Sequence, residues 1–250
     1  MGIIGGQIGY RILRFIAPRS QSSSGSISNE ASDTKTELFF GDAFFKDVVG
    51  KTVIDFGCGR GNQSVEIALK GAGKVIGIDI QEQRLEVGKQ TAKQSGVDDR
   101  CTFATKTSEL GDIVISKDAF EHFADPAEIL QIMSTLLKPN GYILASFGPT
   151  WFHPHGGHLF SVFPWSHLIF TEESQIRWRS DFKTDGATKF SEIEGGLNQL
   201  TIARFEKIVA DSPLCLEWLE TIPIKGISLF KTKALREIGS SIVRCKISLK

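Results

Sequence analysis

The stretch Val53-Ile54-Asp55-Phe56-Gly57-Cys58-Gly59-Arg60-Gly61-Asn62 decides the fold of this chain. An apolar strand predicted over 52–56 runs into three glycines with the spacing G-x-G-x-G. Glycines let a backbone turn tightly and approach a ligand closely. A helix is predicted over 63–70, and its free amide groups would face the same ligand. The stretch therefore predicts a strand–turn–helix unit that binds a small molecule at the turn.

Two acidic residues indicate which kind of ligand the turn binds. The dinucleotide fingerprint is G-x-G-x-x-G, which differs from the spacing found here. Asp55 precedes the first glycine by two positions, where a carboxylate favours the ammonium group of an amino-acid-like ligand and offers nothing to a pyrophosphate. Asp79 ends the next predicted strand, where a carboxylate can bind ribose hydroxyls. A nicotinamide-dependent oxidoreductase is the alternative enzyme class, and a catalytically silent binding protein is a third reading.

Strands and helices alternate outward from this turn. Further strands are predicted at 74–79, 101–105, 112–116 and 141–147, and helices at 82–94 and 126–137, the latter capped by Asp125. Such alternation predicts a doubly wound α/β fold with a mostly parallel sheet. In these folds ligands bind outside the carboxyl ends of the strands.

The remaining sequence suggests three regions. Residues 1–36 are read as an N-terminal arm with a Ser-rich linker, and residues 37–250 as the catalytic domain. Within that domain, 148–196 is rich in aromatic residues, His, Gly and Pro, and we interpret it as an insertion after strand five that lies over the acceptor side as a lid. A helix over 198–211 and strands over 214–222 and 241–249 close the domain.

Four motifs in order resemble class I S-adenosylmethionine-dependent methyltransferases of the small-molecule type. Asp55-x-Gly57-x-Gly59-x-Gly61 with Asp79 resembles the first two motifs of that family. The stretch from Asp112 to Pro126, which includes the pair Glu121-His122, resembles the motif of the fourth strand, and Leu136 to Leu144 that of the fifth. The resemblance covers roughly residues 45 to 150. It implies a seven-stranded sheet with a reversed seventh strand, for which 241–249 is suitable.

The resemblance also implies a cofactor and its binding residues. S-adenosyl-L-methionine would lie with its methionine part at Asp55, Gly57, Cys58, Gly59 and Gly61. Asp79 would bind the ribose, Ile80 would pack on the adenine, and Ser116 and Lys117 would line the methionine end. Where the family often has an acidic residue facing the adenine, this chain has Thr107 and Ser108, so a hydroxyl or backbone group is expected there instead.

Three histidines in the insertion suggest acceptor chemistry. His153, His155 and His158 directly follow the fifth strand and therefore lie near the cofactor site. One of them could be a general base for a hydroxyl acceptor. They could also bind a metal, but the short stretch 153–158 contains no carboxylate or cysteine partner, and we predict no metal site. The third reading is structural, with the histidines capping turns. His122 is a further catalytic candidate with an equal structural alternative.

The acceptor is expected to be a small molecule, methylated at oxygen in preference to nitrogen or carbon. Aromatic side chains of the insertion would suit an apolar or aromatic acceptor, although packing the insertion is their commoner use. The aromatic residues concerned are Trp151, Phe152, Phe160, Phe163, Trp165, Phe170 and Trp178. The oligomeric state is left open by the sequence.

Composition excludes several other classes of protein. The formal net charge of zero gives no indication of nucleic-acid binding, and the four widely spaced cysteines indicate neither a zinc site nor disulfides. A cytoplasmic location is the expectation. Residues 1–18 are basic and place Ile4, Ile8, Ile12, Phe15 and Ile16 on one helical face, so a membrane-surface helix or an organellar transit peptide is an alternative. The four glycines in this stretch favour a frayed, loosely packed arm.

Overall fold

The computed structural model describes residues 2–18, 33–41, 43–193 and 195–250 and is built on a seven-stranded sheet. The strand order is β3-β2-β1-β4-β5-β7-β6, and the first five strands are mutually parallel, whereas β7 is antiparallel to both of its neighbours. The strands are β1 (Thr52–Phe56), β2 (Lys74–Ile78), β3 (Cys101–Ala104), β4 (Gly111–Lys117), β5 (Leu137–Phe147), β6 (Leu214–Pro223) and β7 (Ser240–Leu249). The predicted doubly wound sheet with a reversed last strand is confirmed.

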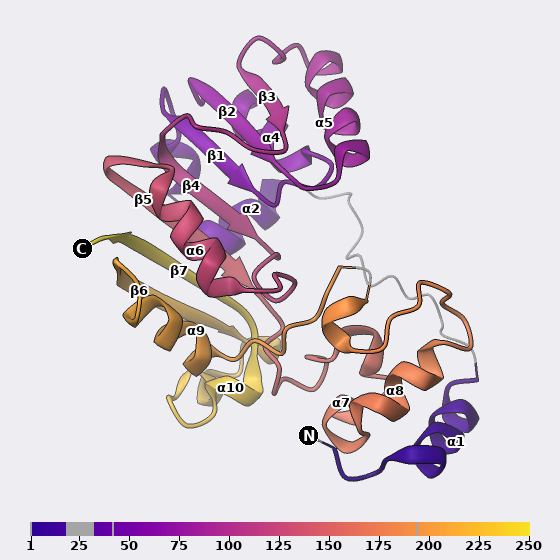
Figure 1. Ribbon diagram of the computed structural model, residues 1–250. Helices are drawn as coiled ribbons and strands as arrows, with labels where there is room; N and C mark the ends of the chain where they lie inside the picture. The colour runs from indigo at the N-terminus through magenta and orange to yellow at the C-terminus, as the bar shows by residue number, and fades with distance from the viewer. Residues whose placement is uncertain (1, 19–32, 42, 194) are drawn as a thin grey trace.

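Helices cover both faces of this sheet (Figure 1). Neighbouring strand residues such as Val53 and Ile54 belong to two different apolar clusters, so each central strand is buried on both sides. One cluster includes side chains of α6 (Pro126–Thr135) and α9 (Ile202–Ala210). The other includes side chains of α2 (Asp33–Phe40), α3 (Phe44–Asp47), α4 (Asn62–Leu69) and α5 (Glu82–Gln94).

Helix ends follow their local side chains. Asp125 caps α6, because its Oδ1 accepts hydrogen bonds from the amides of Ala127 (2.9 Å) and Glu128 (3.2 Å), as predicted. The predicted start of the helix over 198–211 was wrong by four residues. Asn198 instead donates its side-chain amide to the carbonyls of Phe120 and Phe123, and Thr201 caps α9. Between β6 and β7 lie η3 (Ile224–Gly226), η4 (Ser228–Lys231) and α10 (Arg236–Gly239).

The insertion after β5 forms a separate layer, which we call the lid (residues 148–193 and 195–196). Its short helices are η1 (His158–Phe160), α7 (Ser166–Ile169), α8 (Glu172–Arg179) and η2 (Phe190–Glu192). In Figure 1 the lid, in orange, lies beyond the ends of the β1 and β4 arrows, on the carboxyl side of the sheet. The lid has its own apolar cluster, which includes Trp151, Phe160, Phe170 and Trp178.

The N-terminal residues belong to the lid layer, which the sequence did not predict. Gly6–Ile16 form helix α1, which lies against α8 (Figure 1), and Tyr10 and Leu13 are buried in the apolar cluster of the lid. The expectation of a frayed arm is therefore wrong. The glycines that predicted fraying are the reason why this helix can pack closely. A Cβ at Gly9 would lie 2.7 Å from Ser174 Oγ, so glycine permits the close approach of the two helices. The Ser-rich stretch of the linker lies outside the described residues.

The apolar face expected on this helix points to solvent for much of its length. Ile8 is 70% and Phe15 86% exposed, whereas the buried side chains come from the adjacent face. Among the helices of the described residues, none combines the length and the apolar character needed to cross a membrane.

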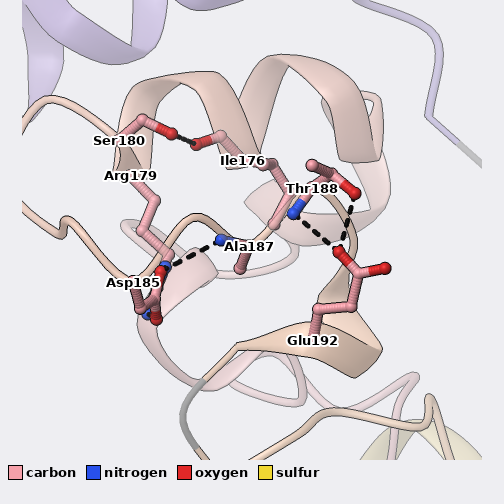
Figure 2. Close-up of polar contacts among 7 residues, drawn as sticks. All are labelled: Ile176, Arg179, Ser180, Asp185, Ala187, Thr188 and Glu192. Atoms are coloured by element: carbon pink, nitrogen blue, oxygen red, sulfur yellow. Dashed lines mark hydrogen bonds and ion pairs between the residues drawn. The ribbon is translucent and has the colours of Figure 1, made fainter.

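Polar contacts brace the end of α8 and the loop after it (Figure 2). Arg179 is buried and donates from both terminal nitrogens to the carboxylate of Asp185, at 2.7 and 2.5 Å. The same carboxylate accepts from the amide of Ala187, and Glu192 Oε2 accepts from both the amide and the hydroxyl of Thr188. Two-point hydrogen bonds of this kind fix side chains geometrically, so this part of the lid is held in one conformation.

Candidate functional site

The glycine turn (residues 57–61) follows β1 at the carboxyl edge of the sheet. Gly57, Gly59 and Gly61 all have left-handed φ angles, of 82°, 56° and 74°. A Cβ at Gly61 would lie 2.3 Å from Phe103 Cε1, whereas a Cβ at Gly59 would meet nothing within 4 Å. Gly61 is therefore required for packing, and Gly59 keeps the backbone open toward the space in front of the turn.

Asp79 ties the end of β2 to this turn. Its Oδ2 accepts a hydrogen bond from the Gly59 amide at 2.9 Å, and its Oδ1 accepts one from the Gln81 amide at 2.8 Å. A carboxylate has about four acceptor positions, so further hydroxyl groups can still bind to it. Ile80, beside it, is 89% exposed. An acidic acceptor and an exposed apolar side chain thus lie where a ribose and an adenine were predicted to bind.

Asp55 is buried directly under the turn. Its Oδ2 accepts a hydrogen bond from Ser64 Oγ at 2.6 Å. Burial raises the pKa of Asp55 to about 6, although the Ser64 hydrogen bond and the charge of Lys117 oppose that shift. A cationic ligand at the turn would favour the ionised carboxylate, which is the role predicted for Asp55.

The other predicted cofactor residues lie at the same edge. Ser116 is the last residue but one of β4, and its buried hydroxyl has no hydrogen-bond partner. Lys117 ends the strand, and its Nζ lies 4.5 Å from the centre of the Phe39 ring. Cys58 is half-buried and donates its backbone amide to Ile78 O. Thr107 and Ser108 lie in the link between β3 and β4, where Thr107 Oγ1 accepts from the Glu109 amide and Ser108 is exposed. The fold therefore brings the predicted cofactor residues to one edge, with the adenine side the most open.

Two of the predicted catalytic histidines, His153 and His155, lie next to each other at the start of the lid, with ring centres 5.9 Å apart. The ring of His153 is buried, with Nδ1 accepting from the His155 amide at 3.0 Å and Nε2 lying 3.4 Å from Ser241 Oγ. Burial lowers the pKa of His153 to about 4, which makes it a weak base. His155 is exposed on the lid. These placements favour the structural reading for His153.

The other two candidates, His122 and His158, bring their rings together where the segment after β4 meets the lid. Their ring centres are 5.2 Å apart. His122 comes from the segment after β4, and His158 comes from η1 of the lid. Burial, together with His122 and His167, lowers the pKa of His158 to about 4.

Glu121 completes this group and was not among the predicted site residues. It is 3% exposed, its Oε1 accepts from the Gly148 amide at 3.3 Å, and burial raises its pKa to about 8. The sequence signal was the pair Glu121-His122 itself. Its significance depends on His158, which the fold brings in from 36 residues further along the chain.

Most aromatic residues of the insertion pack the lid itself. Trp151, Phe160, Phe170 and Trp178 are at most 4% exposed, so they belong to the lid core and do not line an open surface. Phe163 and Trp165 remain 37% and 40% exposed. Most of the aromatic residues predicted for the acceptor side therefore pack the lid.

Comparisons with known proteins agree with this geometry. Residues 47–149 match the family described as "Methyltransferase domain". Over 102 residues the chain is 34% identical to a ribosomal protein L11 methyltransferase of Photobacterium profundum, which covers 40% of this chain and 35% of that protein. Over 105 residues it is 36% identical to a ubiquinone biosynthesis O-methyltransferase of Chromobacterium violaceum, covering 40% of this chain and 45% of that one. The chain thus spans less than half the length of these relatives.

Solved structures share the fold beyond that segment. A magnesium protoporphyrin IX methyltransferase from Synechocystis, solved with bound S-adenosylmethionine, has a TM-score of 0.54 at 18% identity and covers 98% of this chain and 92% of its own. A geranyl diphosphate C-methyltransferase from Streptomyces coelicolor has a TM-score of 0.54 at 17% identity, over 83% of this chain and 77% of its own. At these identities the likeness establishes the Rossmann-like methyltransferase fold.

Proposed function

We propose, from the membership of residues 47–149 in the methyltransferase-domain family, that the chain binds S-adenosyl-L-methionine at the glycine turn and transfers its methyl group to a small-molecule acceptor. The observation that carries the proposal is the position of Asp79. Its carboxylate is fixed against the turn by the Gly59 and Gln81 amides, and it still has acceptor positions for two ribose hydroxyls.

Each part of the methyl donor meets a suitable group of the chain. Asp55 beneath the turn favours the ammonium group, and the backbone of Gly57 to Gly59 accommodates the methionine part. The exposed side chain of Ile80 provides an apolar surface for the adenine. Ser116 and Lys117 line the methionine end, and Thr107 and Ser108 offer hydroxyls on the adenine side.

The reaction requires positioning and exclusion of water more than activation. When bound, the methyl donor would supply a sulfonium whose methyl carbon is open to in-line attack by an acceptor lone pair. The bond from the acceptor to the methyl carbon forms as the carbon–sulfur bond breaks, and the thioether leaves. The turn and the lid then have to hold the two reactants in line, which is the larger part of the protein's contribution. A hydroxyl acceptor also loses its proton. Burial makes both His153 and His158 weak bases, which leaves His122 as the predicted histidine that can assist this step.

An oxygen acceptor of small size is supported by two observations. The lid lies on the carboxyl side of the sheet (Figure 1), the same side that holds the turn. One of the relatives named above is an O-methyltransferase of quinone biosynthesis, and it shares the segment that holds the turn. The relative that acts on a ribosomal protein shares the same segment, so substrate choice depends on the lid and on other parts outside it.

A turnover assay on an acceptor panel tests the proposal. The panel contains phenols, alcohols, amines and carbon acids of similar size. Release of S-adenosylhomocysteine is measured with and without each compound. We expect stimulation by one or more hydroxyl compounds. Stimulation only by amines would overturn the preference for oxygen. Binding of the methyl donor with no turnover on any class would identify a catalytically silent member of the fold.

A further inference from the structure

We propose that Glu121, His122 and His158 form a binding site for one divalent first-row transition-metal ion of the zinc type. One potential ligand atom from each of these residues lies within 4.8 Å of the other two. Two atoms bound to the same tetrahedral Zn²⁺ are about 3.4 Å apart, because each bond is about 2.1 Å long. A pair of ligand atoms at the 4.8 Å limit therefore has to close by about 1.4 Å, which rotation of the three side chains has to provide.

The orientation of His122 suits metal binding. Its Nδ1 lies 2.9 Å from the carbonyl oxygen of Gly196. A carbonyl can only accept, so Nδ1 carries the proton and Nε2 keeps its lone pair. Histidines that bind metals usually donate their other ring nitrogen to a carbonyl or carboxylate in this way.

Two buried atoms in this group lack hydrogen-bond partners. They are Oε2 of Glu121 and Nε2 of His158. A buried polar atom without a partner costs about 1–3 kcal/mol, so native structures rarely keep one without a reason. Within the part of the chain that the structure describes, no lysine or arginine forms an ion pair with Glu121. A cation held between Glu121 and His158 would satisfy both atoms at once.

The chemistry of the three residues selects the class of metal. Two imidazoles and one carboxylate form a ligand set typical of zinc and of other first-row metals, whereas Mg²⁺ and Ca²⁺ prefer oxygen ligands alone. Three protein ligands leave at least one coordination position open. This is the arrangement of catalytic sites; purely structural zinc sites usually have four protein ligands.

The site would link the lid to the sheet next to the glycine turn. His158 belongs to the lid, and Glu121 and His122 follow β4. A Cβ on Gly57 would lie 3.3 Å from Ala119 Cβ, so the segment that carries two of the ligands packs against the turn. Resting on the proposed function, we infer that an acceptor oxygen takes the open coordination position. The metal would lower the pKa of a bound hydroxyl, which assists loss of its proton during methyl transfer.

Titration of the metal-free full chain with Co²⁺ and Zn²⁺ tests the site. The chain is dialysed against a chelator and carries no histidine tag. We expect one Co²⁺ per chain with visible absorption bands, displaced by Zn²⁺. Glu121→Gln, His122→Ala and His158→Ala should each weaken binding by at least about 100-fold, because loss of a direct ligand exceeds the 10–100-fold cost of losing an outer-shell partner. The control His155→Ala removes an exposed imidazole of the same lid and should bind metal as the wild type does.

Three results would overturn this site. They are absence of stoichiometric binding in the wild type, equal binding in all variants, and loss of binding in His155→Ala alone. Circular dichroism of each variant, with S-adenosylhomocysteine binding as a second check, shows whether the chain is folded. Metal binding that persists where the thioether does not bind would reject the proposed function and keep the metal site. Binding of S-adenosylhomocysteine without stoichiometric metal binding would keep the proposed function and reject the metal site.

Discussion

The carboxylate of Asp79 accepts a hydrogen bond from the backbone amide of Gly59 at 2.9 Å, which joins the ends of β1 and β2 into one surface. Twenty residues separate the two positions in the sequence. The contact holds the glycine turn in place and fixes the carboxylate that is proposed to bind the ribose. Several expected outcomes depend on this junction.

Replacement of Asp79 should weaken binding of the methyl donor. Asp79→Ala removes hydrogen bonds to a charged acceptor, and the loss of one such bond, worth about 1.5–3 kcal/mol, should already raise the dissociation constant about 10- to 100-fold. Isothermal titration with S-adenosylhomocysteine measures the change. Asp98→Ala is the matched control, because Asp98 is exposed and precedes β3 at the opposite edge of the sheet. Unchanged affinity in Asp79→Ala would remove this residue from the site.

The last two glycines of the turn, Gly59 and Gly61, should behave differently when changed to alanine. Gly61→Ala should destabilise the fold strongly, because its Cβ would lie 2.3 Å from Phe103. Gly59→Ala should cost only the roughly 1–2 kcal/mol of a left-handed alanine, because nothing lies near its Cβ, and should instead weaken binding of the methyl donor. Urea unfolding and calorimetry on both variants separate the effects. The reverse ranking of the two stabilities would contradict the packing described here.

Ionisation of Asp55 should oppose folding. Its pKa in the fold is about 6, above its ordinary value of 3.8, so the stability contributed by the neutral form is present at low pH and is lost as the pH rises through about 6. Asp55→Asn should therefore raise the free energy of unfolding at neutral pH, by an amount of the order of 3 kcal/mol, with little difference near pH 4.

The same substitution should weaken binding of the methyl donor, because the ammonium group loses a negative partner. Wild-type affinity for S-adenosylhomocysteine should fall as the pH drops below about 6, and Asp55→Asn should lack this dependence. Urea unfolding and calorimetry across the acidic range measure both effects. A wild type more stable than Asp55→Asn at neutral pH would show that the buried carboxylate stabilises the fold.

The buried ion pair of the lid gives an independent test. Asp185→Ala leaves the guanidinium of Arg179 buried without its carboxylate (Figure 2), which should destabilise the lid by about 3 kcal/mol or more. Limited proteolysis should then cut within the lid, and S-adenosylhomocysteine binding at the sheet edge should persist. Asp211→Ala, which removes an exposed ion pair with Lys207, should change stability by less than about 1 kcal/mol. Equal protease resistance in the two variants would argue against the bracing role.

The sheet could be predicted because its signals are local. Apolar runs such as 52–56 and the glycine spacing after Asp55 specify a buried strand and a tight turn without reference to distant residues. Asp125 likewise caps its helix through neighbouring amides. These features depend on residues within a few positions of one another, so a single sequence contains them.

The lid could not be predicted because its contacts join distant segments. From the sequence alone, Gly9 indicates a weak helix, whereas in the fold it allows Ser174 to approach closely. The buried face of α1 is buried because α8 packs against it. No carboxylate lies near His158 along the sequence of the lid. The fold nevertheless brings Glu121 to His158 from the segment after β4. Such pairings depend on tertiary packing, which local sequence patterns do not encode.

The central claim is that the glycine turn binds the methyl donor, and one calorimetric comparison tests it most directly. Wild type and Asp79→Ala are each titrated with S-adenosylhomocysteine and with NADH. The account predicts saturable binding of the thioether, one molecule per wild-type chain, weakened in Asp79→Ala, and no comparable binding of NADH. Tight NADH binding with no response to S-adenosylhomocysteine would contradict it and identify a dinucleotide site instead.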